Sequence, residues 1–229
     1  MTGVQTCALP IYDHVGRLER SSASLRLEFD RVALLAEIEA LLAEAGPVDG
    51  QVRLIVTRGG RRIAATENIP AHGETIKLAT VTYQTTIVLN GVKSLSYAAN
   101  MQATRIAKAS GADEAVLVLP DGTVLEPPTS SIFWVADGAL RTTSLAEGVL
   151  ASITRDRLIK AVPGVEEGAW TLDQVKESSE AFLASTTREL QAVASIDGVA
   201  LPAAPGPRTR EAQVAFAAAR DAALAAAGV

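Results

Sequence analysis

Gly91-Val92-Lys93-Ser94-Leu95-Ser96-Tyr97 is the stretch that best indicates how this 229-residue chain folds. A strand is predicted before it, over residues 76–83, and a helix after it, capped by Ser94 or Ser96 and ending near Ser110. Lys93 is therefore expected at a strand end, where its amine can project into a cleft. A lysine amine becomes a nucleophile when burial or nearby positive charge lowers its pKa.

Three further stretches follow downstream. They are Val124-Leu125-Glu126-Pro127-Pro128-Thr129-Ser130-Ser131-Ile132-Phe133, Ser152-Ile153-Thr154-Arg155-Asp156 and Phe182-Leu183-Ala184-Ser185-Thr186-Thr187-Arg188-Glu189. In this order the four stretches resemble the signatures of the class IV, fold-type IV aminotransferases, which use pyridoxal phosphate (PLP). That family includes branched-chain amino acid aminotransferases, D-amino acid aminotransferases and aminodeoxychorismate lyases. One such stretch alone is weak evidence, whereas four in the right order are strong.

The resemblance extends from Tyr12 to the C-terminus and implies a two-domain α+β or α/β protein with a D-amino acid aminotransferase-like fold. We expect a small, incomplete N-terminal domain over residues 12–72 and a large cofactor-binding domain over residues 73–229. The resemblance also implies a homodimer, with an amino acid and a 2-oxo acid as substrates.

Two residues match the chemical centre of the family's site. Lys93 matches the lysine that forms the Schiff base with PLP and then moves a proton at the substrate carbon. Glu126 matches the carboxylate that keeps the pyridine nitrogen protonated. Pro127-Pro128 follows Glu126 where related proteins usually have Gly and a small residue. The alternatives are a surface lysine in a loop and a glutamate on the solvated edge of a hairpin.

The cofactor's phosphate is expected at the start of a helix, because a helix N-terminus supplies oriented N–H groups and partial positive charge. In the family the backbone N–H groups at the positions of Ile153 and Thr154 bind this anion. Ser152 replaces the usual Gly there and suits the N-cap position.

Side chains complete the expected phosphate and ring contacts. Thr186 matches the family's hydroxyl ligand, assisted by Ser185 or Thr187, although all three could be ordinary turn residues. Arg17 matches an arginine that pairs with the phosphate, and a helix-surface arginine is its alternative. Tyr97 is expected near the cofactor's phenolic oxygen, or else is a core tyrosine.

The substrate is less well indicated. Arg58 and Arg61 lie in a basic turn and are candidates for binding a substrate carboxylate. Ile63-Ala64-Ala65 stands where D-amino acid enzymes have an Arg-x-His element, which disfavours D-amino acids. Thr186-Thr187 is typical of aminotransferases rather than lyases. We therefore favour a transaminase of the branched-chain type, with an aminodeoxychorismate lyase second and a catalytically silent or non-assembling fragment third.

Composition excludes several classes of protein. The chain is 48% hydrophobic and 21% charged with a net charge of −5 and no basic cluster, which argues against nucleic acid as a partner. No apolar run reaches the roughly 20 residues of a membrane span. With one cysteine, Cys7, and two histidines, His14 and His72, no metal site is expected.

Residues 1–11 resemble a translated sequencing-library adapter and show no secretory signal pattern. We exclude them from the fold and expect a truncated, cytoplasmic protein. Elsewhere we expect helices over 12–23, from Asp30 to Gly46, and over 153–161, 172–178 and 209–227. Strands are expected over 52–56, 63–65, 115–119, 123–125, 132–135, 139–140, 181–185 and 193–196.

Overall fold

The structure is a computed structural model that describes residues 11–47 and 49–226. Residues 1–10, which include Cys7 and most of the adapter-like segment, lie outside the described part. The chain divides into two compact units. One contains the residues up to Ala71 together with those from Arg220 onward, and the other spans His72–Ala219.

The first unit is a two-stranded hairpin with two helices. It comprises α2 (Ile11–Ser24), α3 (Arg31–Ala45), β1 (Gln51–Val56) and β2 (Arg62–Glu67). The strands pair antiparallel, and Gly60 between them has a positive φ of 74°. Val15, Leu34 and Ile38 form its buried centre. As predicted, Asp30 caps α3 through a 2.9 Å hydrogen bond from Ala33 N, and Gly46 ends it.

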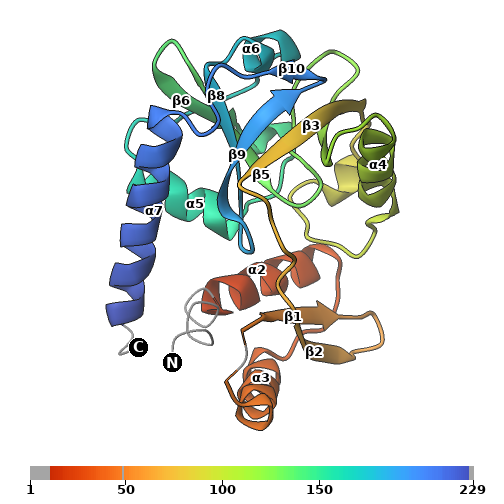
Figure 1. The fold of residues 1–229 in the computed structure, drawn as a ribbon. Coiled ribbons are helices and arrows are strands. Elements are labelled where there is room, and N and C mark those ends of the chain that lie inside the picture. Colours follow the sequence, from red (N-terminus) through yellow and green to blue (C-terminus); the bar gives the residue numbers. More distant parts are fainter. Residues whose placement is uncertain (1–10, 48, 227–229) are drawn as a thin grey trace. The chain divides into compact units, whose positions relative to one another are not determined.

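The second unit is built on an eight-stranded mixed sheet (Figure 1). Its strands are β3 (Thr75–Thr82), β4 (Glu114–Val118), β5 (Ser131–Ala136), β6 (Ala139–Thr143), β7 (Glu166–Gly168), β8 (Glu180–Ser185), β9 (Glu189–Ile196) and β10 (Val199–Ala200). The order is β4-β3-β9-β8-β5-β6-β7, and β10 pairs with β9. The pairs β3–β4, β3–β9 and β6–β7 are parallel, while β9–β8, β8–β5 and β5–β6 are antiparallel.

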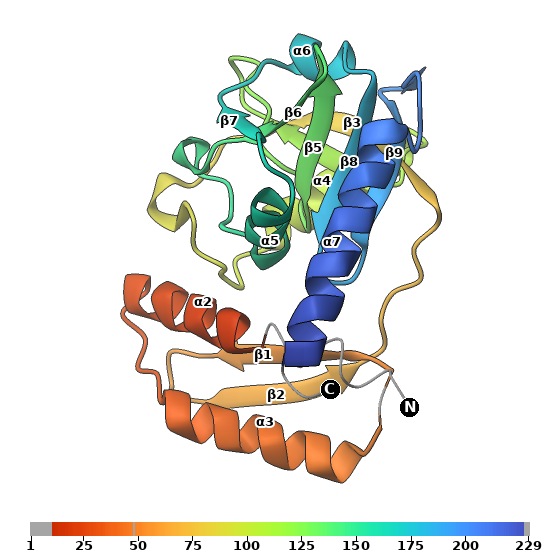
Figure 2. The same ribbon diagram turned by 90° about the vertical axis from the view of Figure 1, so that its left-hand side faces the viewer.

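Helices cover both faces of this sheet. The longer ones are α4 (Ala98–Ala109), α5 (Ile153–Ala161) and α7 (Pro207–Ala226), and the short α6 spans Leu172–Lys176. Ala103 and Ala107 of α4 pack on β3 and β4, while Leu158 of α5 and Ala212 of α7 pack on β5, β8 and β9. Figure 2 shows α5 and α7 in front of the central strands. Val175 of α6 belongs to the core cluster on the opposite face.

Three local predictions need correction. Lys93 is not at a strand end, because β3 stops at Thr82 and the chain then makes a 3-10 turn, Ile87–Leu89, and a left-handed bend at Gly91. Tyr97, not Ser94 or Ser96, is the N-cap of α4, and its side chain makes no capping bond. The predicted strand over 123–125 is reduced to isolated bridges, such as Val118 with Val124.

Candidate active site

Lys93 lies on the long loop between β3 and α4, and its side chain is exposed. Its ammonium nitrogen is 5.8 Å from the centre of the Tyr97 ring, close enough for a cation–π contact. Tyr97 is four positions after Lys93 in the chain, so its ring lies beside the amine. Burial raises the pKa of the Tyr97 hydroxyl far above its usual range, and the charges of Glu126 and Glu114 raise it further. Tyr97 is therefore protonated at neutral pH and can donate a hydrogen bond.

Glu126 is half-buried just beyond the turn at Asp121-Gly122. Its backbone oxygen accepts a hydrogen bond from Leu117 N at 3.2 Å, which fixes the segment against β4. Its carboxylate oxygen Oε1 accepts one from Leu150 N at 2.8 Å. Leu150 is two residues before Ser152, so this bond joins the predicted ring-binding segment to the predicted phosphate-binding turn.

The start of α5 has the geometry expected of an anion site. Ser152 is its N-cap, as predicted, and its hydroxyl accepts a hydrogen bond from Arg155 N at 3.4 Å. The first N–H groups of an α-helix have no partner within the helix, so those of Ile153 and Thr154 stay the predicted anion donors. The Arg155 guanidinium is buried and bound elsewhere, to Thr143 O at 2.9 Å and to Glu167.

A close approach holds the lysine loop beside the loop that precedes α5. A Cβ atom at Gly148 would lie 2.4 Å from the Asn90 side-chain nitrogen, so a larger residue there would displace the Asn90 side chain. Gly148 also has a positive φ of 82°, which favours glycine on backbone grounds. Asn90 is three residues before Lys93 and Gly148 is four before Ser152. The loop that contains Lys93 and the loop that leads to Ser152 therefore approach each other at Asn90 and Gly148.

The turn between β8 and β9 contains the predicted hydroxyl ligands. Ser185 is nearly buried at the end of β8, and Thr186 is exposed in the turn. Thr187 Oγ1 lies 3.2 Å from His72 Nε2. Arg188 forms an ion pair with Glu114 at 2.5 Å, and Glu114 also accepts a hydrogen bond from Thr129 Oγ1 at 2.9 Å.

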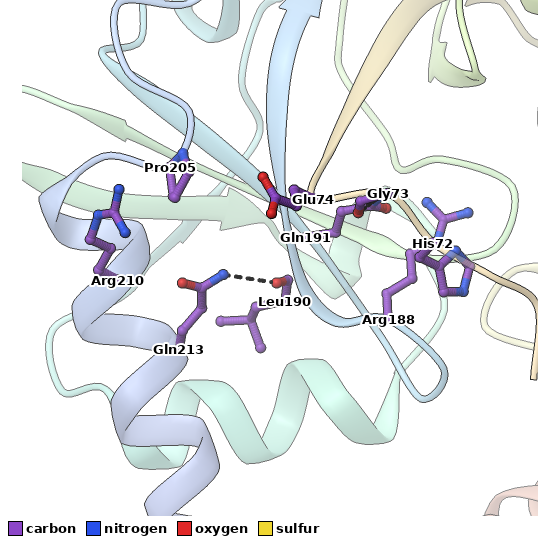
Figure 3. A pocket seen from close by; sticks show the side chains of 9 residues that line it. All are labelled: His72, Gly73, Glu74, Arg188, Leu190, Gln191, Pro205, Arg210 and Gln213. Atoms are coloured by element: carbon purple, nitrogen blue, oxygen red, sulfur yellow. Dashed lines mark hydrogen bonds between the residues drawn. The ribbon is translucent and has the colours of Figure 1, made fainter. Parts of the chain in front are cut away.

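A pocket of about 480 Å³ lies on one side of this turn. Figure 3 shows His72 and Arg188 at one end of it, with Gln191 between them and α7. Gln191 Nε2 donates to Gly73 O at 2.7 Å. None of the predicted cofactor residues is among its lining residues, so it is separate from the predicted cofactor site.

The remaining predicted residues belong to the first unit. Arg17 is half-buried on α2, with its guanidinium 3.2 Å from His14 Nδ1. Arg58 and Arg61 are exposed at the turn between β1 and β2. Their parts in cofactor or substrate binding stay predictions.

Sequence reasoning missed Glu114, Arg188 and His72. Arg188 lies in the fourth of the motif stretches, directly after Thr186-Thr187. Glu114 opens a strand whose other residues are apolar, and an acidic residue at the start of a buried strand is a signal that it needs a partner.

Comparison with known proteins identifies the family. The family model described as "Amino-transferase class IV" matches residues 7–196, well over half of the chain. The chain therefore belongs to the class IV aminotransferases.

Its relatives include enzymes of different substrate preference. It is 27% identical to the D-alanine aminotransferase of Bacillus licheniformis over 227 residues, which cover 89% of this chain and 80% of that protein. It is 32% identical to the branched-chain-amino-acid aminotransferase of Pseudomonas aeruginosa over 126 residues, covering 53% of this chain and 41% of that protein. The solved branched-chain aminotransferase of Escherichia coli has a TM-score of 0.81 and 21% identity, covering 90% of this chain and 78% of that one. That likeness shows the fold, and it confirms the predicted fold-type IV architecture.

Class IV aminotransferases depend on PLP, and the donor set described above suits that cofactor. An amine, a carboxylate bound to a backbone N–H, a helix N-terminus and two hydroxyl groups are the groups that an aldehyde, a pyridine ring and a phosphate require. All of them come from the second unit. No group of three or more metal-ligating side chains occurs within residues 11–47 and 49–226. No helix in this part of the chain is long and apolar enough to cross a membrane.

Proposed function

We propose that this chain binds PLP and transfers an amino group from an amino acid to a 2-oxo acid, with branched-chain amino acids as preferred donors. One observation carries the proposal: Glu126 Oε1 accepts the Leu150 N–H at 2.8 Å. This bond joins two separate family motifs, the ring-binding carboxylate and the phosphate-binding turn, within one unit.

The side chains then have distinct tasks. Bound PLP supplies an electron sink for the bonds around the substrate carbon. Lys93 anchors the cofactor and moves the proton at that carbon, and Glu126 holds the proton on the ring nitrogen. Tyr97 is kept protonated by its environment and is placed to donate a hydrogen bond to the phenolic oxygen of the cofactor.

The phosphate is held by the backbone N–H groups of Ile153 and Thr154 and by the hydroxyls of Ser185 and Thr186. Each of these donors lies at a loop or helix end, where backbone N–H groups or hydroxyls are available. We carry over from the family the homodimer and the phosphate pairing of the arginine at the position of Arg17.

The preference for a branched-chain donor rests on the sequence of β2, in which Ile63-Ala64-Ala65 stands where D-amino acid enzymes have an Arg-x-His element. Arg62 is engaged by Glu37 of α3 at 2.7 Å, which leaves Arg58 and Arg61 as the candidates for a substrate carboxylate.

Borohydride reduction of the PLP-treated chain, followed by peptide mapping, tests cofactor binding. The chain has five lysines, and we expect the adduct on Lys93. Lys160, exposed and paired with Asp156 at 2.7 Å, is the internal control for nonspecific labelling. Equal labelling of Lys93 and Lys160 would refute the proposed site.

The substrate is tested with the loaded chain and three candidates: L-leucine and D-alanine as amino donors, and aminodeoxychorismate as the substrate of a lyase. We expect L-leucine with a 2-oxo acid acceptor to give the fastest amino transfer. Faster turnover of D-alanine would overturn the branched-chain preference. Pyruvate release from aminodeoxychorismate without an acceptor would replace the transaminase by the lyase.

A further inference from the structure

Glu114 is a buried acid with two partners on different loops. It is the first residue of β4 and has only 4% of its surface exposed. One carboxylate oxygen accepts the Thr129 hydroxyl at 2.9 Å, and the other pairs with Arg188 Nη2 at 2.5 Å. Both partners are close in sequence to predicted cofactor ligands, which makes Glu114 a common anchor for two segments.

The first segment runs from Thr129 back to Glu126. Between them stand Pro127 and Pro128, both buried, in place of the Gly and small residue usual in the family. A proline ring fixes φ near −65°, so two in succession form a stiff connection. The hydrogen bond that holds Thr129 in place therefore also fixes the direction of the Glu126 carboxylate. A flexible Gly-containing connection would not transmit it in this way.

The second segment is the turn between β8 and β9. Arg188 directly follows Thr186 and Thr187, and its side chain is 11% exposed. Its Nη1 atom is buried and has no hydrogen-bond partner within the described part of the chain, so Glu114 is the partner that fixes the guanidinium. On the other side of the turn, His72 meets the Thr187 hydroxyl (Figure 3 shows His72 and Arg188).

A buried ion pair is a poor source of stability, because desolvation of both charges offsets their attraction. The ion pair between Glu114 and Arg188 is better explained by the positions in which it holds the two segments. We propose that Glu114 is a positioning residue of the cofactor site, which sets the Glu126 carboxylate through Thr129 and Pro127-Pro128 and sets the Thr186 turn through Arg188. This inference rests on the proposed PLP site.

The decisive variants change Thr129 and leave the buried charges in place. Thr129→Val removes the hydroxyl, and Thr129→Ser keeps it. We expect Thr129→Val to weaken PLP binding about tenfold, the factor given by one lost hydrogen bond to a charged group. It should also shift the absorbance of the bound cofactor, because the ring nitrogen loses its aligned carboxylate. Thr129→Ser should restore both properties.

Thr80→Val is the matched control. Thr80 Oγ1 donates to the Asp197 carboxylate at 2.8 Å, a bond of the same kind elsewhere in the sheet. We expect wild-type cofactor affinity and absorbance for this variant. Equal effects of Thr129→Val and Thr80→Val, or wild-type behaviour of Thr129→Val, would overturn the inference.

Glu114→Gln tests the second arm in the full chain. It keeps the shape of the side chain but removes the charge that holds Arg188. We expect the inhibition constant of inorganic phosphate against PLP binding to be higher in this variant than in Thr129→Val. The reason is that only Glu114→Gln loosens the turn that contains Thr186. Equal inhibition constants in the two variants would refute the role of Arg188. If Glu114→Gln does not fold, the ratio of the PLP dissociation constants of Thr129→Val and Thr129→Ser decides whether the inference holds. Absence of a Lys93 adduct in the wild type would instead refute the proposed function itself.

Discussion

Gly206→Ala should destabilise the protein by about 3 kcal/mol, because the new methyl group would displace a buried carboxylate. A Cβ atom at Gly206 would lie 2.2 Å from Glu180 Cδ and 2.4 Å from its Oε2. Glu180 of β8 is 4% exposed and caps α7, accepting from Arg208 N at 3.1 Å, Thr209 N at 2.9 Å and Thr209 Oγ1 at 2.8 Å.

The magnitude follows from these bonds. Loss of a helix N-cap costs about 1 kcal/mol, and a lost hydrogen bond to a charged group adds about 1.5–3 kcal/mol. Pro207, the first residue of α7, has no N–H of its own, so Arg208 and Thr209 are the donors that lose their acceptor.

Urea unfolding followed by far-ultraviolet circular dichroism measures the effect. Gly59→Ala is the control, since a Cβ there meets nothing within 4 Å, and it should change the unfolding free energy by less than about 0.5 kcal/mol. In a Glu180→Ala background the collision is absent, so Gly206→Ala should then cost less than about 1 kcal/mol. A cost below about 1 kcal/mol for Gly206→Ala in the wild-type background would refute the reasoning.

Three further outcomes are expected. Lys93→Ala should lower transaminase activity by at least about 10³-fold, as loss of a proton-transferring group does, with little change in urea midpoint because the side chain is exposed. Glu126→Gln should lower kcat about 10–100-fold and change the absorbance of bound PLP, which stopped-flow and spectral titration would detect; unchanged kcat would contradict its ring-nitrogen role. Burial, and then the Arg188 charge, lower the pKa of His72 below its ordinary 6.5. As the pH drops below 6.5, the unfolded chain therefore binds a proton at His72 before the folded chain does, and the free energy of unfolding falls. His72→Gln should weaken the pH dependence of the urea midpoint between about pH 7 and about pH 5. An unchanged pH dependence would exclude His72 as its cause.

Elements with strong local signals were predicted well. The limits of α3 follow from Asp30 and Gly46, whose capping bond and positive φ of 66° act within a few residues. The turn at Asp137-Gly138 has positive φ at both positions, as its sequence indicates. In each case the determining contact is local, so the sequence reveals it.

Two elements were not predicted, the strand β7 and the 3-10 turn at Ile87–Leu89. β7 has two glutamates among its three residues and exists because it pairs in parallel with β6, Arg141 opposite Glu166. The loop after β3 contains Ile87-Val88-Leu89, residues typical of a strand, which instead form a 3-10 turn.

The same distinction applies to the candidate site. The motif residues could be proposed because each lies in a recognisable stretch, and their roles stay predictions. His72 was not, since it meets Thr187 across 115 residues of chain, and neither residue predicts the other. The pairing of Glu114 with Arg188 is likewise a product of the folded sheet.

The sheet order has a consequence for synthesis on the ribosome. β3 lies between β4 and β9, and its residue Thr75 is paired with Ala192. The bond from Thr80 N to the Asp197 carboxylate spans 117 positions. Until β9 has emerged, β3 has an unpaired edge, and the Thr186 turn has no strand to follow it. A nascent chain that stalls before β9 therefore contains Lys93 and Glu126 but no assembled site, and it exposes a strand edge open to aggregation.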